Sequence, residues 1–325
     1  MSSSNVILAG MRPTGALHLG HYVGVIRNIV ELQKDFECYF FVADWHALTS
    51  NFDNLEIIRK SRIEYVKGWL ASGVDPKKTH IYKQSSMPEV LYLNQLFLSL
   101  TPPGWADRSP SWKDQVLNPA KKLDNLGFYT YPVLQAADIA VVNANWVPVG
   151  EDQIAHVEIA REIVRKFNRT YNTEIAEPQA KLTKIPKLQG IGGKKMSSSL
   201  GNVITLQESE KSLQKKINKL KTDDERKGIE FPGNPVNCHV FEYYSAFAPE
   251  IQGEVECACK KGELGCGECK QNLGEYMKKE LMPIASKMNS ISDQECLDVL
   301  KEGDEFVSER MKFFWDKINK LIRFL

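Results

Sequence analysis

Short apolar runs alternate with amphipathic stretches over the first half of the chain. The runs Asn5–Gly10, Cys38–Thr49 and Thr79–Ser85 are rich in aliphatic, β-branched and aromatic residues, which is typical of buried strands. His18–Phe36, after the first run, and Leu55–Gly73, after the second, read as helices, with apolar residues at helical spacing in the latter. Strands that alternate with helices predict an α/β fold, with a doubly wound parallel sheet of the Rossmann-like type.

A further stretch, Gly127–Phe167, repeats the pattern as helix, short strand, turn and helix. After it, Lys184–Ile204 is rich in Gly, Ser and Lys and weak in periodicity, which predicts a mobile loop at a domain junction. The chain then becomes mostly helical. We therefore expect a Rossmann-like catalytic domain over 1–194, a helical domain over 195–290, and a last helix over 291–325 that packs back on the body.

The composition is that of an ordinary globular protein. The 325 residues are enough for two domains, and no apolar run approaches the roughly 20 residues of a membrane span. The N-terminal segment has no basic stretch before its apolar run, so we expect no signal peptide and a cytosolic protein. The net charge of +1 neither demands nor excludes a nucleic-acid partner.

The turn after the first predicted strand carries two histidines, His18 and His21, with Gly20 between them. It lies at the carboxyl edge of the sheet, where such folds bind ligands, and a helix that starts here directs free N–H groups at an anion. The two imidazoles can donate hydrogen bonds to phosphate oxygens as charge builds up during nucleotidyl transfer. The alternative is that one histidine caps the helix and the other fills the core.

A second candidate element is KKMSSS, Lys194–Ser199, which follows a Gly-rich stretch. Its lysines and hydroxyls suit a loop that folds over a triphosphate, although such a string can equally be an exposed linker. HLGH and KMSSS in this order, on opposite sides of an alternating strand–helix region, are more specific than either motif alone.

These two motifs resemble the HIGH and KMSKS motifs of class I aminoacyl-tRNA synthetases. Five stretches are similar, in order, to those of the tryptophanyl-tRNA synthetase family: RPTGALHLGHYVG, FVADWHALT, YPVLQAADI, VPVGEDQIAHVEIAREI and KMSSS. FPGNPVNC resembles the helical domain of that family. The resemblance implies a homodimeric tryptophan–tRNA ligase that uses ATP with Mg²⁺, converts L-tryptophan to tryptophanyl-adenylate, and transfers the amino acid to tRNA(Trp).

The resemblance also assigns site residues by position. The implied catalytic residues are His18, His21, Lys113, Lys195, Ser197 and Ser198. The implied ATP-binding residues are Arg12, Pro13, Thr14, Gly20, His21, Gly150, Glu151, Asp152, Ile185, Lys195, Met196, Ser197, Ser198 and Ser199. The implied tryptophan-binding residues are Asp138, Tyr131, Gln153 and His46, with the Asp138 carboxylate accepting the indole N–H. Asp138 could instead cap or pair with a helix, and His46 could be a satisfied core residue.

One position departs from the family motif. Ser198 stands where KMSKS has its second lysine, which in the family helps to stabilise the leaving pyrophosphate. Lys194, Lys195 or Lys113 would then carry more of that charge, or the step would be slower.

The seven cysteines are unevenly placed, and six of them lie in the last third of the chain. Cys238, Cys259, Cys266 and Cys269 could bind Zn²⁺ tetrahedrally or hold a [4Fe–4S] cluster. Some bacterial members of the family carry a comparable cysteine set with an iron–sulfur cluster, which favours the cluster over zinc. Cys257 is an extra candidate ligand, and the alternative is a set of reduced, partly buried thiols.

Three further interpretations stay open. The stretch Glu210–Lys227 offers a basic helix face that could meet tRNA phosphates, or it could be a solvated helix with interspersed acids. Among enzymes, a tyrosine-specific relative and a small nucleotidyltransferase with a His-x-Gly-His turn are the alternatives. The remaining possibility is a non-catalytic paralogue that binds RNA or senses iron or redox state.

Overall fold

The computed structural model describes residues 5–117, 125–182, 188–194 and 196–322. Five parallel strands form one sheet in the order β3-β2-β1-β4-β5. The strands are β1 (Val6–Met11), β2 (Glu37–Val42), β3 (Thr79–Lys83), β4 (Trp146–Val149) and β5 (Gln179–Leu182). The strand order reverses at β1, which creates the crevice where open α/β sheets bind ligands. The predicted doubly wound α/β fold is confirmed.

Helices cover both faces of the sheet, and side chains alternate between two apolar cores, as the two-residue period of a strand requires. Ala9 and Phe40 point into the core beneath α2 and α4, whereas Leu8 and Phe41 point into the core beneath α5, α9 and α10. The helices of this part are α1 (Leu19–His21), α2 (Arg27–Leu32), α3 (Asp44–Asn51), α4 (Leu55–Ala71), α5 (Pro88–Leu100), α6 (Pro103–Ala106), α7 (Pro110–Leu117), α8 (Leu126–Tyr129), α9 (Tyr131–Val141) and α10 (Ile154–Tyr171). A π-helical turn, Tyr22–Ile26, joins α1 to α2.

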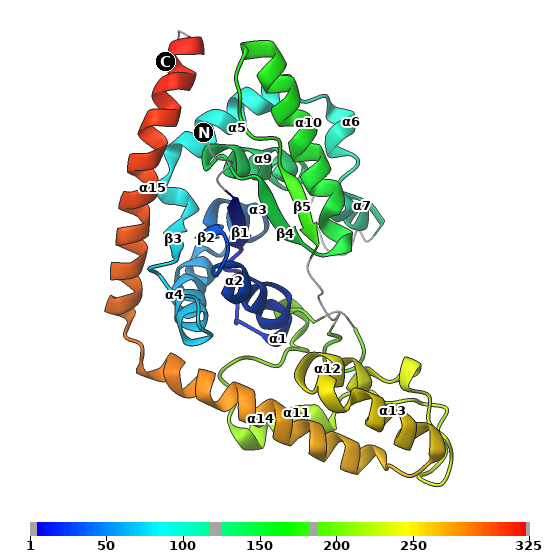
Figure 1. Cartoon of the computed structure of the whole chain (residues 1–325). Helices are drawn as coiled ribbons and strands as arrows, with labels where there is room; N and C mark the ends of the chain where they lie inside the picture. Colours follow the sequence, from blue (N-terminus) through cyan, green and yellow to red (C-terminus); the bar gives the residue numbers. More distant parts are fainter. Residues whose placement is uncertain (1–4, 118–124, 183–187, 195, 323–325) are drawn as a thin grey trace.

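The second half of the chain is helical and adjoins the α2 and α4 side of the sheet (Figure 1). It contains α11 (Glu210–Asn218), α12 (His239–Phe247), α13 (Gln252–Lys261) and α14 (Cys266–Ser290). The last helix, α15 (Asp293–Ile322), returns along the edge strand β3. Leu213, Tyr244 and Met277 of the helical half belong to the same apolar core as Phe40. The domain limits at residues 194 and 290 stay a prediction, because this core is continuous across the first of them.

The expected strand Cys38–Thr49 is wrong beyond Val42. The chain leaves the sheet at Ala43 and forms α3, whose first turn begins with Asp44. The Asp44 carboxylate accepts hydrogen bonds from the backbone N–H groups of Trp45 and Ser85, at 3.1 and 2.9 Å. A negative charge at a helix N-terminus is stabilising. The apolar run alone gave no sign of this turn, because His46 and Ala47 of α3 are also buried.

Other differences concern helix limits. The stretch Glu210–Lys227, considered above as a basic helix, is helical only over Glu210–Asn218 as α11, and the chain beyond it is irregular up to Asn234. The sequence pattern did not predict β5 or the helices α5 to α7. Within the described ranges, none of the helices has both the length and the apolar character that a membrane crossing needs.

Candidate active site

A cleft with a volume of about 1280 Å³ opens at the carboxyl end of the strands. Its walls come from the end of β1, the helix that follows it, α9, the turn after β4, and α12 of the helical half. Ten residues that the sequence singled out line this cleft: Arg12, Thr14, Gly20, His21, His46, Tyr131, Asp138, Gly150, Glu151 and Gln153.

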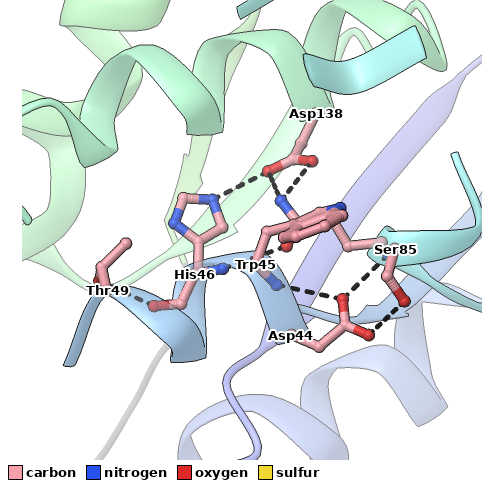
Figure 2. A network of polar contacts seen from close by, with 7 residues as sticks. Asp44, Trp45, His46, Thr49, Ser85 and Asp138 are labelled. Carbon is pink, nitrogen blue, oxygen red and sulfur yellow. Dashed lines mark hydrogen bonds and ion pairs between the residues drawn. The ribbon is translucent and has the colours of Figure 1, made fainter. Parts of the chain in front are cut away.

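One end of the cleft is closed by Asp138, a carboxylate with only 1% of its surface exposed. His46 donates from Nε2 to its Oδ2 at 2.9 Å (Figure 2). The Gln84 Nε2 donates to both carboxylate oxygens at 2.8 and 2.9 Å. Burial raises the pKa of Asp138, and the hydrogen bond from His46 opposes that rise. Because a carboxylate offers about four acceptor positions, these three bonds leave room for one more donor from the cleft.

A second carboxylate, that of Asp44, binds Ser85, the residue next to Gln84. Besides the backbone contacts given above, its Oδ2 accepts a hydrogen bond from Ser85 Oγ at 2.5 Å (Figure 2). Burial raises the pKa of Asp44. Asp138 therefore binds the side chain of Gln84, and Asp44 binds the next residue, so that one buried and one partly buried carboxylate hold this segment after β3.

Tyr131 and Gln153 meet at a buried histidine that the sequence did not single out. The ring of His156 lies with Nδ1 at 2.8 Å from Tyr131 Oη and at 2.7 Å from Gln153 Oε1. On its other side, Nε2 lies 3.2 Å from Ser109 Oγ, just before α7. Tyr131 is thus held in place by a hydrogen-bonded chain that runs from α9 through α10 to the start of α7.

At the other end of the cleft, the rings of His18 and His21 stack with centroids 3.7 Å apart. Burial lowers the pKa of His18 to about 4. Burial also lowers the pKa of His21 well below its usual value, and the charges of His18 and Arg12 add to this effect. Both rings are therefore neutral at pH 7. Nδ1 of His18 is buried and has no hydrogen-bond partner among the described residues.

The segment that contains KMSSS lies directly against the HLGH turn. The backbone N–H of Leu19 donates to the carbonyl of Ile204 at 2.9 Å, and Ser198 Oγ donates to the carbonyl of Ala16 at 3.3 Å. A Cβ built on Gly20 would lie 3.7 Å from Met196 Sδ, so the two motifs touch without an intervening side chain. Two motifs that are far apart in the sequence thus meet beside the end of the cleft that Gly20 and His21 line.

The remaining sequence candidates are placed as follows. Lys113 is exposed on α7 and does not line the cleft, although Ser111 of the same helix does. Pro13, His18, Met196, Ser197 and Ser198 are not among the residues that line the cleft. Four candidates cannot be described structurally: Lys195 and Ile185 lie outside the described residues, and so do the side chains of Asp152 and Ser199.

Sequence reasoning missed Gln84, which is fully buried, and Glu242 and Ser245 of α12, which line the cleft. Gln84 directly follows β3, and a polar residue at the carboxyl end of a buried parallel strand was the signal that could have identified it. No pattern pointed to Glu242 or Ser245, because a separate helical region brings them to the cleft.

The four candidate ligand cysteines gather where α12, α13 and α14 begin or meet. Their thiols are close enough for electrostatic interaction: Cys238, Cys259 and Cys266 each act to raise the pKa of Cys269, whose burial brings it to about 12. Arg226 Nη1 lies 3.7 Å from Cys266 Sγ. In the described part of the chain, however, no three His, Cys, Asp or Glu side chains are arranged closely enough to hold a metal ion. Four thiols are the right ligands in kind and number for Zn²⁺ or a [4Fe–4S] cluster. They lie near one another, but among the described residues they are not arranged as a ligand shell.

Two of the basic residues considered for tRNA are occupied inside the protein. Lys216 Nζ binds Glu208 Oε1 at 2.5 Å and the carbonyl of Val203 at 3.0 Å. Arg226 donates to the backbone carbonyls of Phe231 and Leu264. They support the local fold, which leaves the exposed lysines of this region as candidates.

Comparison with known proteins identifies the family. The model of the class I tRNA synthetases (W and Y) matches residues 2–282. The chain belongs to this family. The tryptophan–tRNA ligase of Thermotoga maritima is 43% identical over 310 residues, which cover 93% of this chain and 94% of that protein. The enzyme of the same name from Aquifex aeolicus is 36% identical, with 88% of this chain and 90% of that protein covered.

Solved structures agree with this assignment. The tryptophanyl-tRNA synthetase of Campylobacter jejuni, complexed with ADP and tryptophan, superimposes with a TM-score of 0.83 at 33% identity and covers 98% of this chain and 99% of that one. The tyrosyl-tRNA synthetase of Archaeoglobus fulgidus gives a TM-score of 0.70 at 20% identity, with 87% of this chain and 90% of that one covered, and shares the fold.

Proposed function

We propose that this protein is a tryptophan–tRNA ligase. The observation that carries the proposal is the buried Asp138 carboxylate, which faces the cleft with its other acceptor positions already bonded to His46 and Gln84. A site that hydrogen-bonds a substrate N–H rejects analogues that lack the donor by about 10⁴–10⁵-fold, because the buried acceptor is then left unpaired. An indole N–H satisfies Asp138, whereas the side chain of phenylalanine carries no donor. The assignment of this role to Asp138 is part of the proposal.

In the first step, the tryptophan carboxylate attacks the α-phosphorus of ATP, the bond to the bridging β-phosphate oxygen breaks, and pyrophosphate leaves. Mg²⁺ enters as part of the ATP substrate. Tyr131 and Gln153 orient the ammonium and carboxylate of the amino acid. His18 and His21 act as neutral hydrogen-bond donors, because their lowered pKa values keep them uncharged at pH 7. Preorganised neutral donors stabilise the charge that develops on the phosphate oxygens.

The remaining ATP contacts in the proposal follow the family positions. Arg12, Pro13 and Thr14 line the nucleotide, the turn Gly150–Asp152 approaches the ribose, and Ile185 borders the adenine. Lys113 and the segment Lys195–Ser199 meet the triphosphate. In the second step, the tryptophanyl group passes to the terminal ribose of tRNA(Trp), and AMP is released.

The experiment that tests the proposal is amino-acid-dependent exchange of labelled pyrophosphate into ATP. We expect exchange with tryptophan and at least about 10³-fold less with tyrosine or phenylalanine. Exchange that depends on tyrosine instead would identify the tyrosine-specific relative. The absence of exchange with any amino acid would identify a non-catalytic paralogue, and either result contradicts the proposal.

We also propose that Cys238, Cys259, Cys266 and Cys269 hold a [4Fe–4S] cluster, with Zn²⁺ as the alternative. The support is the gathering of four thiols from three helix boundaries, beside a guanidinium that offsets thiolate charge. When bound, such a group would supply a cross-link between elements of the helical half and take no part in adenylate formation.

Matched cysteine variants test the metal proposal. Iron and zinc are measured in protein purified without oxygen, together with visible absorbance. We expect Cys259→Ser to lose the metal and Cys257→Ser, only two residues away and exposed, to keep it. Protein without iron or zinc, or equal loss in both variants, would contradict the assigned ligands.

The partners in this proposal are L-tryptophan, ATP and tRNA(Trp), and the protein would work in the cytosol, where tRNA is used. The family resemblance leads us to propose a homodimer. Light scattering of the purified protein tests it, and a monomer at micromolar concentration would contradict it.

A further inference from the structure

The C-terminal helix α15 lies along the edge strand β3 (Figure 1). Among the side chains of α15 that the structure describes, none lines the cleft. A Cβ built on Gly303 would come within 1.8 Å of the carbonyl oxygen of Ile81. Because a side chain at this position would have to displace backbone, the glycine allows the helix to approach the strand closely. The close approach fixes the position of α15 against the end of β3.

Asp304, the next residue, binds Lys83 at the end of β3 and Ser86 in the turn after it, so its contacts lie on both sides of Gln84 in the sequence. Its Oδ1 accepts from the backbone N–H of Lys83 at 2.9 Å. Its Oδ2 accepts from Ser86 Oγ at 2.8 Å and pairs with Lys83 Nζ at 2.7 Å. The Asp304 side chain is only 15% exposed, so these contacts are shielded from solvent. A single carboxylate thus holds the residue before Gln84 and the residue two positions after it.

The Gln84 side chain between these contacts has one orientation. Its Oε1 accepts from the backbone N–H of His46 at 3.2 Å, so its NH₂ group must face Asp138. That group donates to both oxygens of Asp138. The plane of the Asp138 carboxylate, and hence the direction of its remaining acceptor position, therefore depends on where the turn after β3 places Gln84.

We propose that Asp304 is a positioning residue for amino-acid selection. By holding Lys83 and Ser86, it fixes Gln84, and Gln84 fixes the orientation of Asp138 toward the indole N–H. The proposal rests on the proposed function of Asp138. A displacement of about 1 Å in a group that orients a substrate is enough for a large kinetic effect. The effect falls on tryptophan rather than on ATP, because the HLGH and KMSSS end of the cleft makes none of these contacts.

The test uses Asp304→Ala and Asp304→Asn in the full chain. Pyrophosphate exchange is measured against both tryptophan and ATP, and tryptophan binding without ATP is measured by calorimetry. For Asp304→Ala we expect the KM and Kd for tryptophan to rise about tenfold, the loss of roughly one good hydrogen bond, with the KM for ATP changed less than about twofold. Asp304→Asn keeps an oxygen acceptor for the Lys83 N–H, and we expect it to recover part of the affinity.

The matched control is Asp298→Ala on the same helix. Asp298 is exposed and its Oδ1 accepts from Gln294 within the helix, so we expect wild-type values. Ser86→Ala removes one of the Asp304 contacts and leaves the ion pair. It serves as the milder variant if Asp304→Ala does not fold, with an expected rise in tryptophan KM of about threefold.

Three outcomes would overturn the positioning role. They are unchanged tryptophan binding in both Asp304→Ala and Ser86→Ala, equal changes in the KM for tryptophan and ATP, and equal effects of the Asp304 and Asp298 substitutions. Wild-type protein that binds no tryptophan would overturn the proposed function as well. If the wild-type protein binds tryptophan and the variants bind it equally well, the positioning role alone is overturned.

Discussion

The two ends of the cleft are built on different principles. At the Asp138 end, a buried carboxylate accepts hydrogen bonds from His46 and Gln84, and a second, partly buried carboxylate, Asp44, binds the segment after β3. At the other end, two neutral histidines stack, and Nδ1 of His18 has no hydrogen-bond partner among the described residues. The first end presents one remaining acceptor position to a ligand, whereas the second holds two neutral imidazole rings, of which that of His21 lines the cleft. We therefore expect substitutions at the Asp138 end to change the use of tryptophan and substitutions at the histidine end to change the use of ATP, each without the other.

The largest expected effect is at Asp138. Asp138→Ala removes the acceptor for the indole N–H and leaves the donors of His46 and Gln84 unpaired. We expect kcat/KM for tryptophan to fall about 10³-fold, or about 4 kcal/mol, while the KM for ATP changes less than about threefold. Steady-state pyrophosphate exchange with each substrate varied in turn measures both. An equal rise in the KM for ATP would show that the two ends are not separable.

The sequence predicted the local motifs at the two ends of the cleft, but it did not predict the contacts between distant segments. HLGH and KMSSS are local strings that the sequence singled out together, and the structure brings them into contact, while their role at the phosphates stays a prediction. The resemblance of YPVLQAADI to the tryptophanyl-tRNA synthetase family pointed to Asp138. His156 and Asp304 could not be found in this way, because their contacts join segments 25 and 218–221 residues apart. The turn at Ala43 was missed because a buried strand and a buried helix share the same apolar residues.

The second prediction concerns pH and the stacked histidines. The pKa of His18 is lowered from 6.5 to about 4 in the folded protein, so the unfolded chain binds more protons between these values. The contribution of neutral His18 to the free energy of unfolding is therefore fully present above pH 6.5, and it is lost as the pH falls toward 4. From pH 7 to pH 5, His18 alone should remove about 2 kcal/mol from the free energy of unfolding.

Urea unfolding at the two pH values measures this loss. His18→Gln should make the free energy of unfolding less dependent on pH than it is in wild type. An identical pH dependence in wild type and His18→Gln would contradict a neutral, buried ring at the phosphate end.

Gly20 offers a smaller and more selective test of the same end. A Cβ at this position would lie 3.1 Å from the His18 ring, tighter than an ordinary contact, and 3.7 Å from Met196 Sδ. We expect Gly20→Ala to lower kcat/KM for ATP about tenfold and to leave tryptophan binding unchanged. Gly253→Ala, where a Cβ meets nothing within 4 Å, is the control. A loss of tryptophan affinity in Gly20→Ala would argue against separate ends.

The smallest expected effect comes from restoring the family lysine. Ser198→Lys adds a cation beside the phosphates, and we expect kcat for exchange to rise about threefold with tryptophan KM unchanged. Leu200→Lys places the same charge on an exposed residue of the same segment and serves as the control. Equal effects of the two substitutions would show that charge in general, and not this position, is responsible.

The most direct test of the account uses a tryptophan analogue in which sulfur replaces the indole N–H, so that shape is kept and the donor is lost. Pyrophosphate exchange is compared for the analogue and for tryptophan, in wild type and in Asp138→Ala. We predict that wild type prefers tryptophan by at least about 10³-fold and that the variant shows little preference. Equal use of both substrates by wild type, or the same preference in the variant, would contradict selection by the Asp138 carboxylate.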